Sequence, residues 1–99
     1  MKRENKYQQQ LMELLEVTFE ADAKIFKSSP YAPQGWPDIT IIHKSGRWAF
    51  LEAKKSKDEP HQPNQDWYVE LLDNWGFAAF IYPENEDEVI DELVKYLSW

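Results

Sequence analysis

The chain has 99 residues, 18 acidic and 11 basic, with a net charge of −7 and no cysteine. This length predicts one domain over residues 1–99, and the lack of cysteine excludes disulfides, cysteine-ligated metal and thiol catalysis. No apolar run approaches the roughly 20 residues of a membrane span, so we expect a cytoplasmic protein without membrane contacts. Taken alone, the net charge argues against a nucleic-acid partner, because phosphate binding favours lysine and arginine.

The first half of the chain predicts a helix, a short strand and a β-hairpin. Leu11, Leu14 and Leu15 recur at helical spacing within residues 4–18 and predict the buried face of a helix. Residues 23–27 predict a strand, and residues 28–35, with two prolines and a glycine, predict a loop. Two further strands follow at 38–43 and 48–54, joined by a turn at 44–47.

The second half predicts a helix, a strand and a final helix after a polar loop at 55–60. We expect the first helix at 63–75, since Pro63 suits a first helical turn and Gly76 suits a helix end. Residues 77–82 predict a buried strand, and residues 85–97 predict an amphipathic helix. The element order is therefore α-β-β-β-α-β-α, which indicates an α/β fold.

The predicted hairpin carries the candidate chemistry. Asp38 opens its first strand, and Glu52 and Lys54 end its second strand on one face, because they lie two residues apart. Burying these charges is costly without compensation, and a divalent cation with an anionic substrate would supply it. Asp38, Glu52 and the carbonyl oxygen of Ala53 are hard oxygen ligands of the kind that Mg²⁺ prefers, and Mn²⁺ could substitute. Lys54 would orient the attacking water or neutralise a phosphate.

Pro37-Asp38, followed after thirteen residues by Glu52-Ala53-Lys54, resembles the PD-(D/E)xK nuclease superfamily, and the Gly-x-Pro-Asp form resembles its VRR-NUC branch (virus-type replication–repair nucleases). The resemblance implies a restriction-endonuclease-like α-β-β-β-α-β core, with an added C-terminal helix here. It also implies three further site residues: Glu4 and Gln8 from the first helix, and Gln65 from the start of the second. Glu4 would act as a metal ligand, directly or through water, although Glu13 and Glu16 lie on the same helix.

Several other residues have more than one interpretation. We expect Trp36, in the loop beside Asp38, to face the substrate, whereas Trp48, Trp67 and Trp75 are interpreted as core residues. His43 is interpreted as structural and His61 as a loop residue that could touch substrate. A local basic cluster next to the predicted site suits phosphate contacts, and its members include Lys44, Arg47, Lys54, Lys55 and Lys57.

The combined hypothesis is a metal-dependent endonuclease acting on DNA. Stand-alone proteins of the resembling family are typically phage or bacterial and act on branched DNA, so four-way-junction cutting is expected. Two symmetric cuts require two active sites, which predicts a C2 homodimer, and a replication or recombination protein could recruit it. The alternative is a non-catalytic acidic binding or inhibitory protein that keeps a nuclease-like fold. Asp38, Glu52 and Lys54 count against this alternative, because a binder has no need of all three.

The charge is unevenly distributed along the chain. Residues 61–99 carry nine acids and one base, whereas residues 1–60 carry nine acids and ten bases. Three of the acids in the first part are the proposed site residues Glu4, Asp38 and Glu52, which a cation would offset. The distribution therefore predicts a DNA affinity that depends on divalent metal more than on a broad basic patch.

Overall fold

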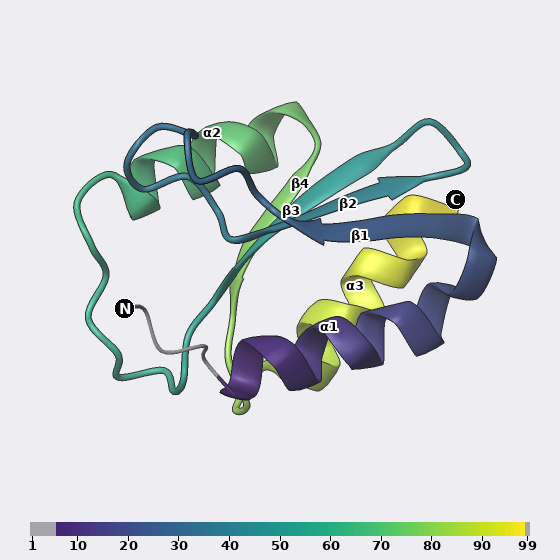
Figure 1. Ribbon diagram of the computed structural model, residues 1–99, viewed down its shortest axis with the longest axis horizontal. Coiled ribbons are helices and arrows are strands. Elements are labelled where there is room, and N and C mark those ends of the chain that lie inside the picture. The colour runs from purple at the N-terminus through teal and green to yellow at the C-terminus, as the bar shows by residue number, and fades with distance from the viewer. Residues whose placement is uncertain (1–5, 99) are drawn as a thin grey trace.

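The computed structural model describes residues 6–98, which form a four-stranded sheet with helices on both faces (Figure 1). The predicted order of elements and the predicted fold class are confirmed. The elements in chain order are α1 (Lys6–Phe19), the short 3₁₀ helix η1 (Glu20–Asp22), β1 (Ala23–Lys27), β2 (Ile39–His43), β3 (Trp48–Ala53), α2 (Gln65–Trp75), β4 (Phe77–Ile81) and α3 (Glu86–Ser98).

The strands lie in the order β1-β2-β3-β4, so the sheet follows the chain. The β1–β2 and β2–β3 pairs are antiparallel, and Gly46 takes a φ of +92° in the tight turn between β2 and β3. The β3–β4 pair is parallel, because α2 carries the chain back along the sheet before β4 begins. Ile39 pairs with Leu51 in the β2–β3 ladder, and this register brings the start of β2 next to the end of β3.

The two faces of the sheet carry separate apolar clusters. On one face α1 and α3 pack against the strands, and Leu11, Leu15, Ile41, Leu51 and Leu93 are among the fully buried residues there. On the other face α2 packs against β3 and β4 through Val69 and Leu72, together with the half-buried rings of Trp36, Trp48, Phe50 and Phe80. Figure 1 shows α2 alone on its side of the sheet, with α1 and α3 on the other.

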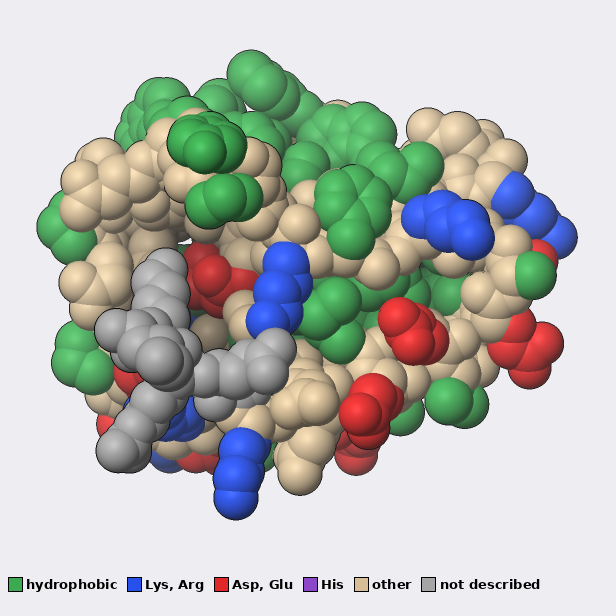
Figure 2. Space-filling view, in the orientation of Figure 1, with side chains coloured by type: hydrophobic (Ala, Val, Ile, Leu, Met, Phe, Trp, Pro, Cys, Tyr) green, Lys and Arg blue, Asp and Glu red, His purple; other side chains and the backbone are tan. Residues whose placement is uncertain are grey.

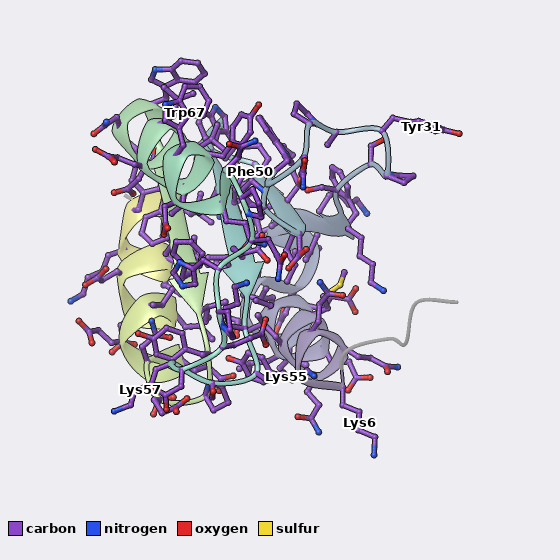
Figure 3. All side chains as sticks on the ribbon, turned by 90° about the vertical axis from the view of Figure 1, so that its left-hand side faces the viewer. Lys6, Tyr31, Phe50, Lys55, Lys57 and Trp67 are labelled. Carbon is purple, nitrogen blue, oxygen red and sulfur yellow. The ribbon has the colours of Figure 1, made fainter. Side chains whose placement is uncertain are left out.

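Three predictions of core residues were wrong. Leu14 is 38% exposed, because the buried side of α1 is formed by Leu11, Leu15 and Phe19, which are spaced four residues apart. Trp67 and Trp75 are 60% and 68% exposed, because the buried side of α2 is formed by Gln65, Val69 and Leu72. Figure 3 shows Trp67 projecting outward from α2.

The start of α2 also differs from the prediction. The helix begins at Gln65, two residues after Pro63, because Asn64 takes a left-handed backbone with a φ of +70° and a helical turn cannot run through it. Within residues 6–98 no helix has the length and apolar character needed to cross a bilayer.

Candidate active site

Asp38 and Glu52 meet where β2 begins and β3 ends. The fully buried Pro37 fixes the chain just before β2, and Asp38 Oδ2 accepts a hydrogen bond of 3.3 Å from the backbone N–H of Ala53. The backbone of Asp38 is also held, since Ser28 N–H donates a hydrogen bond of 2.7 Å to the carbonyl oxygen of Asp38. The first acid of the predicted motif is therefore tied to the strand that carries the second.

Glu52 is a buried carboxyl group with an unsatisfied oxygen. The residue is 3% exposed, and its Oε1 atom has no hydrogen-bond partner among the described residues. Burial raises the pKa of Glu52 to about 9, a hydrogen bond to Asp38 and the charge of that residue add to the increase, and Lys54 opposes it. The carboxyl group therefore keeps a proton at neutral pH unless a cation replaces it.

Lys54 is buried directly beyond the end of β3, with its side chain 3% exposed. Its ammonium donates hydrogen bonds to Gln65 Oε1 at 2.7 Å and to the carbonyl oxygen of Pro60 at 3.2 Å. Glu59 Oε2 lies 3.4 Å from the same nitrogen and forms an ion pair with it. The charge of Lys54 is thus held in one place by three partners.

Gln65 contacts the site through Lys54. It is the first residue of α2 and is buried, and its Oε1 also accepts a hydrogen bond of 2.8 Å from the backbone N–H of Gln62. One amide oxygen thus joins the loop before α2 to the ammonium. The structure places the predicted glutamine next to the predicted lysine, in a geometry that positions Lys54.

A single open cavity of about 880 Å³ brings most of the predicted site residues together. Its walls include seven of them: Gln8, Trp36, Asp38, Glu52, Ala53, Lys54 and Gln65. Lys55 and Lys57 are exposed and do not line it, and Figure 3 shows both on the loop away from Trp67. Glu4 lies outside the described residues. Figure 2 shows an acidic side chain within a hollow in the face shown, with a basic side chain beside it.

Trp36 lines this cavity, but its ring is also a packing element. It contacts Phe50 and Tyr68 edge to face, each at a centroid distance of 5.3 Å. The preceding Gly35 has a φ of +91°, and a Cβ atom there would lie 2.7 Å from atoms of Pro63 and Asn64. The loop that carries Trp36 is therefore fitted closely against the start of α2.

The cavity wall also contains polar residues that were not predicted from the sequence, among them Lys27, Ser28, Glu59 and Gln62. Lys27 ends β1 and pairs with Ile39, next to Asp38. Its place as the last residue of a strand was visible in the sequence, but the pairing of that strand with β2 was not. Glu59 stands five residues after Lys54 in a polar loop, and nothing in its pattern predicts that the loop folds back.

The two histidines lie outside the cavity wall. His43 is buried, contacts Phe19 edge to face at 6.0 Å and accepts a hydrogen bond at Nδ1 from Ser45 N–H, which confirms its structural interpretation. His61 stacks on Phe80 at 4.0 Å, and its Nδ1 lies 2.7 Å from Asp66 Oδ1. It is thus fixed by two contacts, and the prediction that it could touch substrate stays a prediction.

The donor set of the site fits a hard divalent cation. Two carboxyl groups lie together, and one buried carboxylate oxygen, Glu52 Oε1, has no partner among the described residues. Residues 6–98 contain no group of three or more histidine, cysteine or acidic side chains that could hold a metal ion. A cation here would therefore take two carboxylates, with water or carbonyl oxygens in the other positions, as Mg²⁺ commonly does.

Comparison with known proteins supports the fold independently. No protein-family model matches this sequence, and no curated protein matches it. A solved structure described as a VRR_NUC domain superposes with a TM-score of 0.66 at 22% sequence identity, over 93% of this chain and 98% of that one. The chain thus has the fold of a VRR_NUC domain, which is the fold that the Pro-Asp and Glu-x-Lys motif predicted.

Proposed function

We propose that this protein is a metal-dependent nuclease that hydrolyses phosphodiester bonds in DNA. The observation that carries the proposal is the buried Glu52 carboxyl group, with an unsatisfied oxygen, beside Asp38 and near Lys54 in an open cavity. Holding Glu52 and Lys54 away from water costs stability that a buried apolar pair would not. A cation and an anionic substrate together would compensate each of these charges.

Asp38 and Glu52 would hold the metal ion, together with the backbone carbonyl of Ala53, and Glu4 is proposed as a further ligand. Bound Mg²⁺ or Mn²⁺ would lower the pKa of a water molecule and offset charge on the phosphate. Glu52 has to release its proton before the cation can bind. Cation binding and proton release are therefore coupled at this residue.

The remaining groups act on the substrate. Lys54 would place a positive charge beside the phosphate or orient the attacking water, and Gln65 keeps its ammonium in position. Gln8 and Trp36, in the cavity wall, would contact the nucleic acid next to the scissile bond. Lys55 and Lys57 lie outside the cavity, so we propose that they contact phosphates further along the DNA.

The resemblance of the Pro-Asp and Glu-x-Lys motif to the VRR-NUC family implies a more specific substrate. We propose branched DNA, with four-way junctions as the specific case, cut symmetrically by a C2 homodimer. A replication or recombination protein is the proposed recruiting partner. A mass of one chain in size-exclusion chromatography at working concentration would contradict the homodimer, while leaving the nuclease proposal intact.

The test uses labelled linear, nicked and four-way-junction DNA with Mg²⁺, with Mn²⁺ and with a chelator. We expect metal-dependent cleavage that falls at least about 100-fold in Asp38→Ala and Lys54→Ala, because each change removes a charge that acts on the transition state. Lys95→Ala is the matched control, since Lys95 is exposed on α3. Thermal melting of each variant separates loss of activity from loss of folding.

Two outcomes would overturn the proposal. One is cleavage that persists in the chelator or in Asp38→Ala. The other is a folded protein that cuts none of the three substrates with either metal, and tight binding to a basic protein would then favour the acidic binding protein.

A further inference from the structure

Partners from one short segment surround the ammonium of Lys54. A lysine ammonium has three N–H donors and no acceptor. Gln65 Oε1 and the carbonyl oxygen of Pro60 accept two of them, and Glu59 Oε2 lies 3.4 Å away as the paired anion. All three partners belong to residues 59–65, so this segment closes around Lys54. A phosphate oxygen can approach the ammonium closely only if one of these partners moves away.

Glu59 is the partner that can leave at the lowest cost. Its side chain is 29% exposed, whereas Gln65 is buried and is also held by the N–H of Gln62. Its contact with Lys54 is the longest of the three, and its other oxygen accepts a hydrogen bond of 2.8 Å from Lys55 N–H. Rotation into water would give up this hydrogen bond and the ion pair without moving any helix or strand.

The negative charge of Glu59 is a second reason to expect that it leaves Lys54 when a phosphate enters. It lines the cavity with Asp38 and Glu52, so an entering phosphate meets three acidic side chains. A metal ion would offset the first two, but Glu59 pairs with the lysine that the phosphate itself would use. Two anions competing for one buried ammonium exclude each other at contact distance.

We propose that Glu59 occupies the place on Lys54 that a phosphate group of the substrate takes, and that it moves into solvent when a tetrahedral oxyanion binds. The inference rests on the proposed function for the identity of its ligand. It adds an internal competitor that weakens substrate binding and leaves the chemical step unchanged.

The first test measures anion binding without any cleavage. Magnesium sulfate is titrated into the protein with magnesium chloride as the reference, so that only the tetrahedral anion differs. The backbone amide of Lys55 is the reporter in ¹H–¹⁵N NMR spectra, because its hydrogen bond to Glu59 breaks when Glu59 leaves. We expect this amide to shift with sulfate alone, and Glu59→Gln to bind sulfate about three- to tenfold more tightly.

The second test measures cleavage of four-way-junction DNA in Mg²⁺. For Glu59→Gln we expect KM to fall about three- to tenfold with kcat within about twofold of the wild type. Glu84→Gln is the matched control: it removes the same charge from an exposed residue whose carboxylate accepts from Lys57 N–H, outside the cavity. It should match the wild type in both tests.

The outcomes separate the two proposals. A Lys55 amide that sulfate does not move, or sulfate affinity unchanged in Glu59→Gln, overturns the competitor. A fall in kcat without a fall in KM also overturns it and would make Glu59 a positioning residue for Lys54. If no variant cuts DNA but sulfate moves Lys55 and binds more tightly to Glu59→Gln, the nuclease proposal fails and the competitor stands.

Discussion

The two faces of β3 are both covered by helices but differ in burial and in chemistry. Ala49, Leu51 and Ala53 belong to the apolar cluster under α1 and α3. On the face toward α2, the half-buried Trp48 and Phe50 are followed by the buried Glu52, and Lys54 comes just beyond the strand end. Burial on the first face stabilises the fold, whereas burial of the charged groups on the second opposes it. One strand therefore both anchors the sheet and presents the site.

Truncation of the apolar face should have the largest effect on stability. Leu51 is fully buried, so Leu51→Ala should lower the free energy of unfolding by about 3 kcal/mol through lost burial and the cavity left behind. Urea denaturation measures this change. The control is Leu14→Ala on α1, which should cost less than about 1 kcal/mol, because Leu14 is 38% exposed. Equal losses in the two variants would contradict the assignment of the core.

The polar face should instead show itself in the pH dependence of stability. Burial raises the pKa of Glu52 from an ordinary 4.5 to about 9 in the folded protein. The folded state then binds more protons than the unfolded chain between these values, so this stabilising contribution is complete below pH 4.5 and is lost as the pH rises toward 9. In chelator we expect a loss of about 2 kcal/mol or more from Glu52 across this range.

Glu52→Gln isolates that contribution, because the amide does not titrate. Unfolding free energies of the two proteins, measured in chelator at several pH values, should diverge as the pH rises, with the variant more stable at alkaline pH. Mg²⁺ should stabilise the wild type there and leave the variant less affected. Parallel pH profiles for the two proteins would show that burial does not raise the pKa of Glu52.

Features that depend on local geometry were predicted from the sequence, whereas features that depend on long-range packing were not. Strand alternation and β-branched residues predict the hairpin, and the spacing of Asp38, Glu52 and Lys54 predicts their meeting, since both depend on local geometry. Glu59 and Lys27 were missed because their places depend on a loop that folds back and on which strand β1 joins. Trp67 and Trp75 were wrongly assigned to the core, since an apolar residue in a helix does not reveal how wide its buried stripe is.

The join between the Trp36 loop and α2 should be the next most sensitive feature. Gly35→Ala meets both a φ of +91° and contacts of 2.7 Å at Pro63 and Asn64, whereas Gly46→Ala meets a φ of +92° with open space around it. The Gly46 variant should lose about 1 kcal/mol from backbone strain, and the Gly35 variant should lose more and also disturb Trp36. Urea denaturation and tryptophan fluorescence together measure both effects. Equal losses would show that the loop yields easily and does not fix this side of the site.

The smallest effect is expected at the outer end of α2. Trp75 is 68% exposed, whereas Trp48 is half-buried, packs against Phe50 and lies directly against Gly76. Trp75→Ser should therefore lower the free energy of unfolding by about 0.5 kcal/mol or less, and Trp48→Ser by several times more.

Figure 2 shows apolar side chains gathered on the α2 side of the molecule, so the result also tests whether this surface is exposed in solution. If Trp75→Ser were as costly as Trp48→Ser, and the melting temperature of the wild type rose with protein concentration, Trp75 would be buried in an oligomer. If the melting temperature does not depend on concentration and Trp75→Ser loses little stability, Trp75 is exposed in solution. The stability of both faces of the sheet then comes from the packing around β3.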